Sequence, residues 1–145
     1  MKAQEELEKI LTDEALVESK TEELIRLDSL AKKMTAALDG ESVSRSRNLD
    51  PMGTVIASKD KLFCEIARIQ EANEKRKAYL SGIIDGLKKP VFIKILYGRY
   101  FNGKSLNTIA EEEGYCYRNI CYLHGNALQA MEKIMGDGES FHIFS

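Results

Sequence analysis

The stretch SLNTIAEEEGYCYRNICYLHGNAL, from Ser105 to Leu128, carries the most specific pattern in the chain. Ser105 is a preferred residue for capping the start of a helix. Gly114 suits a turn that needs a positive φ. The stretch therefore predicts two helices joined by a turn, the first ending near Glu113 and the second beginning at Cys116.

The spacing of the small and apolar residues predicts how these two helices pack. Gly114, Ile120 and Leu123 lie four, ten and thirteen residues after Ala110. A small residue at 110 lets the helices cross closely, and the two later apolar residues hold the second helix on the first. This is the pattern of a helix-turn-helix, and an ordinary helical hairpin is the alternative.

The second of these helices has a polar face that suits DNA. Arg118 and Asn119 fall in its first turn, where arginine can pair with guanine and asparagine with adenine. A solvated polar face is the alternative, but tyrosines on the same face favour an interface. We expect the DNA-binding residues to be Tyr117, Arg118, Asn119, Cys121 and Tyr122, with Ser105, Lys104 and Arg99 contacting phosphates and Lys88, Lys89 and Lys94 as further candidates.

Two long helices are predicted before this motif. Residues 2–38 contain no proline or glycine, and residues from about 54 to 85 contain one glycine. Apolar residues recur at steps of three and four in both, which is close to a heptad pattern. The two stripes predict an antiparallel, coiled-coil-like hairpin with a thin core, so we expect self-association, with Asn73 and Arg76 at seam positions setting the register.

The predicted fold is therefore all-α, with a long N-terminal helical hairpin followed by a C-terminal helix-turn-helix. Residues 1–87 form the hairpin and oligomerisation region, with a loop at about 39–53. Residues 88–136 form the DNA-binding domain, whose leading helix spans about 90–101 behind Pro90. Residues 137–145, with Phe141, Ile143 and Phe144, are expected to form a frayed tail.

Composition limits the classes of protein that fit. The 145 residues are 43% hydrophobic and 30% charged, with a net charge of −2, so DNA binding needs a local basic patch. Residues 88–133 supply seven basic and four acidic side chains. The start, MKAQEELEK, lacks the apolar segment of a signal peptide, and no run approaches the roughly 18 apolar residues of a membrane span. We expect a cytoplasmic protein with no membrane contact.

Metal and catalytic sites are not predicted. Cys116, Cys121 and His124 would give an incomplete set of zinc ligands, and Cys116 would lie on a different helix face from Cys121. No Ser/His/Asp or Cys/His set has supporting context. We therefore expect no metal, no cofactor and no enzymatic activity.

The string LYGRYFNGKSLNTIAEEEGYCYRNICYLHGNALQAMEK strongly resembles region four of bacterial sigma factors. The chain from KTEELIRLDSLAKKMTAAL onward looks like a family of small phage and prophage proteins, which resemble phage late-gene transcription regulators related to autolysin regulators. The resemblance implies binding to double-stranded DNA and allows contact with RNA polymerase. The residues that carry the likeness to region four are Arg99-Tyr100, Ile109-Ala110, Gly114-Tyr115, Ile120 and Ala127-Leu128.

These features together favour a phage- or prophage-type transcription regulator that is a homo-oligomer. A DNA-packaging adaptor like a phage small terminase subunit is one alternative, because such adaptors also join a helix-turn-helix to a coiled oligomerisation core. A pure protein-interaction module is the other alternative.

Overall fold

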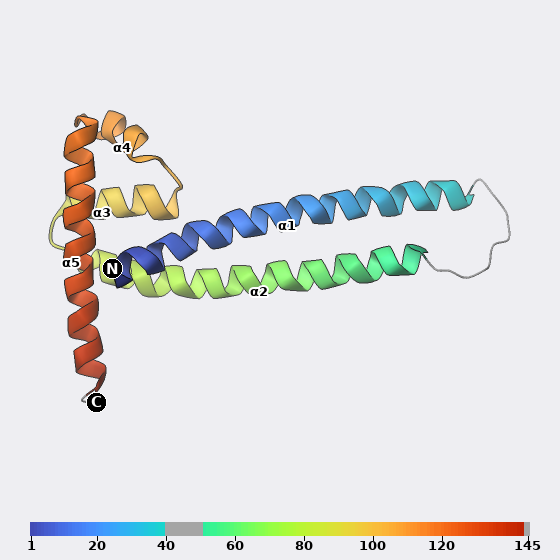
Figure 1. Ribbon diagram of the computed structural model, residues 1–145, viewed down its shortest axis with the longest axis horizontal. Coiled ribbons are helices and arrows are strands. Elements are labelled where there is room, and N and C mark those ends of the chain that lie inside the picture. Colours follow the sequence, from blue (N-terminus) through green and yellow to red (C-terminus); the bar gives the residue numbers. More distant parts are fainter. Residues whose placement is uncertain (40–50, 144–145) are drawn as a thin grey trace. The chain divides into compact units, whose positions relative to one another are not determined.

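A computed structural model describes the backbone of residues 1–39 and 51–143 and the side chains of residues 1–37 and 51–136. These residues form helices and connecting turns, with no strand, which confirms the all-α prediction. Figure 1 labels the main helices. In chain order the elements are α1 (Lys2–Asp39), α2 (Pro51–Asp85), α3 (Pro90–Leu96), the π-helical η1 (Tyr97–Phe101), α4 (Leu106–Glu113) and α5 (Tyr117–Ile143).

The chain divides into two compact units, and each long helix contributes to both of them. Unit 1 comprises Met1–Asp13 and Asn73–Ser145, and unit 2 comprises Glu14–Ala72. The division differs from the sequence boundary between residues 87 and 88, because the first turns of α1 and the last turns of α2 pack with the C-terminal helices. That residues 88–136 form a domain by themselves stays a prediction.

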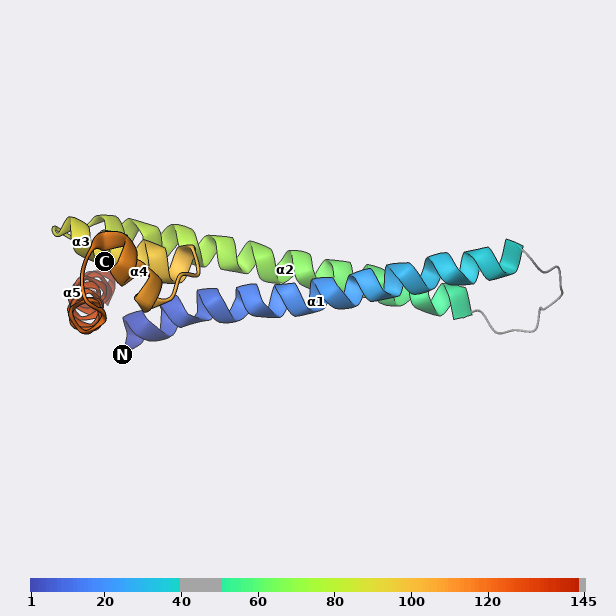
Figure 2. The same ribbon diagram turned by 90° about the horizontal axis from the view of Figure 1, so that it is seen from above.

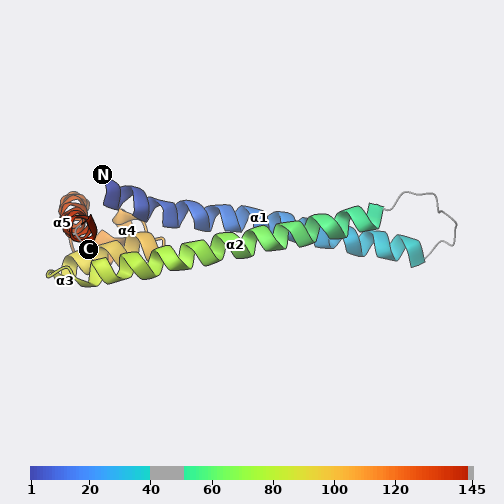
Figure 3. The ribbon, with the colours of Figure 1, turned by 90° about the horizontal axis from the view of Figure 1, so that it is seen from below.

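Unit 2 is an antiparallel pair of helix segments, which lie side by side in Figures 1, 2 and 3. The predicted seam faces inward: Leu27 and Ile66 are buried, and Leu24 and Leu62 are half-buried. Ion pairs cross the seam from Lys20 to Glu65 at 2.9 Å and from Lys59 to Asp28 at 2.8 Å. The α2 segment begins at Pro51 rather than near residue 54, because proline is well accommodated in the first turn of a helix.

Unit 1 contains the larger core. The ends of α1 and α2 pack with α3 and α5 around side chains that are fully or almost fully buried. Pro90 stands at the start of α3, as predicted. The buried apolar residues of this core are Ala3, Leu7, Ile10, Leu80, Ile84, Leu87, Phe92, Leu96, Tyr100, Ala127, Leu128, Met131 and Met135.

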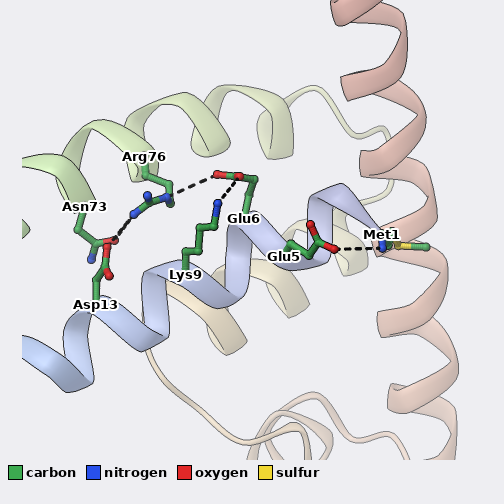
Figure 4. Close-up of polar contacts among 7 residues, drawn as sticks. All are labelled: Met1, Glu5, Glu6, Lys9, Asp13, Asn73 and Arg76. Carbon is green, nitrogen blue, oxygen red and sulfur yellow. Dashed lines mark hydrogen bonds and ion pairs between the residues drawn. The ribbon is translucent and has the colours of Figure 1, made fainter.

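A polar cluster interrupts the apolar seam of unit 1 (Figure 4). Arg76 Nη1 lies 2.8 Å from Asp13 Oδ2, and Arg76 Nε lies 3.5 Å from Glu6 Oε2. Asn73 is 5% exposed and donates to the Ile10 carbonyl oxygen at 3.5 Å. A hydrogen bond from Lys9 is the main reason that the pKa of Glu6 is lowered. Asn73 and Arg76 therefore contact α1 of the same chain, and their predicted part in self-association stays a prediction.

Two elements differ from the sequence expectation. The predicted helix over 90–101 changes to a π-helical turn after Leu96, in which the Asn102 N–H donates to the Tyr97 carbonyl oxygen at 3.0 Å. Helix α5 continues to Ile143, so the backbone is helical over most of the predicted tail. Glycines such as Gly136 weaken a helix without ending it, and no proline follows them. Phe141, Ile143 and Phe144 of the predicted tail lie outside the described side chains.

Candidate nucleic-acid interface

Helix α4 begins with the predicted serine cap. The Thr108 N–H donates to Ser105 Oγ at 3.1 Å, and the Ser105 and Thr108 hydroxyls lie 2.9 Å apart. Ser105 has φ −76° and ψ 157°, which is the extended conformation of an N-cap residue. The Ser105 side chain therefore makes the N-cap half of a capping box, and the Thr108 hydroxyl contacts the Ser105 hydroxyl rather than its backbone N–H.

The turn between α4 and α5 depends on Gly114. This residue has φ 76° and ψ 23°, the left-handed conformation that glycine adopts with little cost. The N–H of Gly114 donates to the Ala110 carbonyl oxygen. The Tyr115 N–H also donates to that oxygen, at 3.0 Å, so the Ala110 carbonyl group near the end of α4 accepts two hydrogen bonds. The Ile120 N–H then donates to the Cys116 carbonyl oxygen at 3.1 Å as α5 begins.

The two helices are held together by a small apolar cluster. Ile109, Ala110 and Ile120 are 3%, 3% and 0% exposed, and Leu123 packs against them partly buried. These are the residues that the spacing predicted to hold the motif. Ile95 of α3 completes the cluster. The local sequence does not indicate this contact, because η1 and a turn separate Ile95 from α4.

A buried glycine allows α4 to approach the preceding helical turn. A Cβ atom added to Gly98 would lie 3.2 Å from Ile109 Cδ1. Gly98 belongs to η1, so the π-helical turn and α4 are in close contact. Sequence reasoning missed this contact, because a glycine within a predicted helix does not reveal which neighbour approaches it.

The first turns of α5 place aromatic side chains in solvent. Tyr117 and Tyr122 are 54% and 68% exposed, and Tyr115 in the preceding turn is 42% exposed. Arg118 is exposed, and Asn119 is half-buried. Cys121 is also half-buried, and its hydrogen bond with Tyr117 is the main reason that the pKa of Tyr117 is raised. The assignment of these residues to DNA contacts stays a prediction.

An open depression connects three of the predicted phosphate-contact and recognition residues. It has a volume of about 340 Å³ and is lined by Arg99, Ser105, Leu106, Asn107 and Tyr117. Arg99 also donates from Nη1 to the Lys104 carbonyl oxygen at 3.3 Å. The structure thus brings Arg99, Ser105 and Tyr117 to one surface, although they come from three different segments.

Two of the candidate phosphate-contacting lysines form ion pairs with glutamates of α4. Lys104 Nζ lies 2.7 Å from Glu112 Oε2, and Lys94 Nζ lies 3.4 Å from Glu113 Oε1. Such exposed pairs contribute little to stability, but each carboxylate offsets the positive potential of its lysine. A net count of charges along the sequence does not show this pairing, because Lys94 and Glu113 are far apart in the sequence and meet only in the folded protein.

His124 of α5 contacts Tyr100 of η1. Its Nε2 atom lies 2.9 Å from the hydroxyl of Tyr100, and the two rings stack with centroids 5.7 Å apart. Burial raises the pKa of Tyr100 to about 12 and lowers the pKa of His124. Within the described side chains of residues 1–37 and 51–136, no group of three or more His, Cys, Asp or Glu side chains is arranged to hold a metal ion.

The start of α1 is attached to α5 through a glutamate that sequence analysis did not single out. The Ala3 N–H donates to Glu132 Oε2 at 2.6 Å. A carboxylate at this position satisfies one of the free N–H groups of the first helical turn and interacts favourably with the helix dipole. Glu132 therefore caps α1 from a distant part of the chain.

These observations define an all-α protein in which a short helix, a glycine turn and a longer helix form a packed helix-turn-helix. Comparison with protein-family models, with curated proteins and with solved structures finds no match. None of the helices in the described part of the chain has both the length and the apolar composition needed to cross a bilayer.

Proposed function

We propose that this protein is a phage- or prophage-type transcription regulator that binds double-stranded DNA through α4 and α5 and oligomerises through its N-terminal helices. The observation that carries the proposal is the packed motif itself. Ser105 caps α4, Gly114 makes the turn, and Ile120 is buried against Ile109. This packing leaves Tyr117, Arg118 and Tyr122 exposed at the start of α5.

The exposed side chains suit recognition in the major groove. In a helix-turn-helix, the first residues of the second helix reach the base edges. Arg118 and Asn119 can each make a pair of hydrogen bonds to one base. The resemblance to sigma factor region four also supports a contact with RNA polymerase, which we include in the proposal as an analogy.

The modest basic character of the motif supports binding by more than one copy. Lys104 and Lys94 form ion pairs with glutamates, which offset two of the seven basic side chains of residues 88–133. Phosphate contacts supply much of the affinity of DNA-binding proteins. Two motifs carried by one oligomer would raise the affinity through their effective concentration.

The same ion pairs favour a second candidate function, a protein-interaction module. The surface formed by Tyr115, Tyr117 and Tyr122 is aromatic. Tyrosines are enriched in protein interfaces. The glutamates of α4 would oppose a DNA backbone and would not oppose a basic protein surface.

A selection of bound sequences from a random pool of DNA duplexes tests the proposal. The full chain should enrich a defined sequence, and the distance between enriched half-sites should report the spacing of two motifs. Arg118→Ala and Asn119→Ala should each weaken binding to that sequence by about 1–3 kcal/mol at fixed salt, without unfolding the chain.

The matched control is Arg68→Ala, which removes an exposed arginine from α2 in unit 2. It should leave the affinity for the selected sequence unchanged. Unchanged affinity in both α5 variants would overturn the assignment of the recognition face. If the chain binds no duplex even at low salt, the protein-interaction module becomes the better description.

A further inference from the structure

We infer that one face of the unit 2 hairpin is a homodimer interface that binds the same face of a second copy of this chain. The face is formed by Leu24, Ile25, Ile56 and Phe63, and we call it the Phe63 face. This inference rests on the oligomeric part of the proposed function and does not depend on DNA binding.

The Phe63 face exposes large apolar side chains that the hairpin itself does not cover. Phe63, Ile25 and Ile56 are 64%, 60% and 47% exposed. Ile56 and Phe63 are seven residues apart on α2, so they lie on one side of the helix. Ile25 of α1 lines the same depression as Phe63. A contiguous apolar surface of this kind marks an interaction site.

The core of unit 2 is small, so burying the Phe63 face against a second copy would add to the stability of the hairpin. Among its described side chains, Leu27 and Ile66 are buried. Long helices take most of their stability from tertiary packing rather than from helix propensity. Apolar residues that extend beyond the seam, as Phe63 and Ile56 do, favour bundles of more than two helices. A second hairpin would complete a four-helix bundle and enclose the seam from this side.

The Phe63 face has an exposed aromatic side chain, Phe63, and beside it an open depression that can accept such a side chain. An open depression of about 320 Å³ is lined by Leu24, Ile25, Asp28, Lys59, Asp60 and Phe63. Interfaces with twofold symmetry join the same surface on both subunits. A twofold axis through this face places Phe63 of each copy against the depression of the other, so a second copy satisfies both features at once.

The charges at the edge of the face are compatible with self-association. Asp28 pairs with Lys59 at 2.8 Å and with Lys32 at 3.1 Å. Asp60 adds one further carboxylate beside them. The depression is thus lined by one positive and two negative side chains, and Lys32 offsets one of these carboxylates, so two copies of the face do not present a large charge of one sign to each other. A strongly charged partner would find no complementary surface here.

The side of the unit 2 hairpin that carries the Phe63 face is large enough for a dimer interface. The 22 residues of α2 in unit 2, Pro51–Ala72, span about 33 Å at about 1.5 Å per residue, and two helices are roughly 20 Å wide. The projected area is then about 660 Å², close to the roughly 800 Å² that a stable interface buries on each partner.

Analytical ultracentrifugation of the full chain without DNA tests the inference. The wild-type protein should sediment with about twice the chain mass of 16.4 kDa. Phe63→Glu should weaken dimerisation by at least about tenfold, because it buries a carboxylate without a partner. The control Ala57→Glu adds the same charge at an exposed position about 120° around α2 from Phe63, and it should keep the wild-type mass.

Circular dichroism of Phe63→Glu separates loss of the interface from loss of the fold. If this variant loses helicity, oxidative cross-linking replaces it as the test. With the native cysteines replaced by serine, Phe63→Cys should form a covalent dimer and Ala57→Cys should not. A wild-type protein that is monomeric at up to about 100 μM, an unchanged mass in Phe63→Glu, or equal cross-linking of the two cysteine variants would overturn the inference. Failure to bind DNA would leave each of these results unchanged.

Discussion

Gly114 is the residue on which the turn between α4 and α5 depends. Its φ of 76° is costly for a residue with a side chain. Gly114→Ala should therefore lower the free energy of unfolding by about 1–2 kcal/mol, measured by urea denaturation. Gly82→Ala is the control: Gly82 is in α2, and an added Cβ atom would have nothing within 4 Å. It should raise stability by up to about 1 kcal/mol, because alanine favours a helix. Equal changes in both variants would contradict this role of Gly114.

At the scale of single residues, the sequence predicted the features that depend on local chemistry. The cap by Ser105 and the turn at Gly114 follow from what a serine oxygen and a missing Cβ atom allow, and both are confirmed. The pairing of Lys104 with Glu112 was not predicted. An ion pair depends on where the chain brings two side chains, so the residue types alone do not specify it.

The contact between η1 and α5 predicts a pH dependence of stability. Burial lowers the pKa of His124 from its usual 6.5, and Arg99 acts in the same direction, whereas Glu8 opposes it. The folded protein therefore favours the neutral imidazole, while the unfolded chain takes up a proton near pH 6.5. The contribution of His124 to stability is complete above pH 6.5 and falls as the pH decreases from 6.5 toward the lowered pKa.

Urea denaturation at pH 7.5 and pH 5.5 measures this effect. The wild-type protein should lose stability between these values, and His124→Gln should lose less, because glutamine does not titrate. Tyr100 stays protonated in this range, since its pKa is about 12. The pKa of Glu6 is also lowered, so the contribution of Glu6 to stability is lost in a different pH range, below pH 4.5. An equal loss in wild type and His124→Gln would show that other groups are responsible.

At the scale of helices, periodicity predicted α1, α2 and their shared seam. It did not predict the π-helical turn over Tyr97–Phe101. One additional residue in a turn shifts the apolar pattern by a single position, which a short helix cannot reveal. Tertiary contacts accompany the turn: the Tyr97 hydroxyl donates to Asp85 Oδ1 at 2.8 Å and lies 2.6 Å from Ser81 Oγ. Both partners belong to α2, so the contacts of this turn involve residues outside the segment that forms it.

At the scale of the whole chain, the two units differ in how much apolar surface they bury. The core of unit 1 includes Leu7, Leu80 and Met131, each 0% exposed. Unit 2 buries Leu27 and Ile66 among its described side chains. Each long helix passes from one environment to the other without a break, so secondary structure gives no sign of the change. The periodicity predicted a thin hairpin core over residues 1–87, and this range includes the well-packed ends of both helices.

The unequal cores predict unequal protection of backbone amides along α2. Local opening is easiest where few apolar contacts must be broken. Amides in residues 73–85 should therefore exchange at least about tenfold more slowly than those in residues 51–72, a difference of about 1.4 kcal/mol in opening free energy. Hydrogen–deuterium exchange with mass spectrometry of fragments measures this difference at low protein concentration, where dissociation of a dimer is favoured.

Raising the protein concentration tests the source of the difference. If a second copy covers the Phe63 face, residues 51–72 should become more protected, while residues 73–85 in unit 1 should change little. The variant Phe63→Glu should abolish this dependence on concentration, and Ala57→Glu should keep it. Uniform protection along α2 at low concentration would show that α2 opens as a single unit. The small core around Leu27 and Ile66 would then be sufficient to stabilise unit 2 without a second copy.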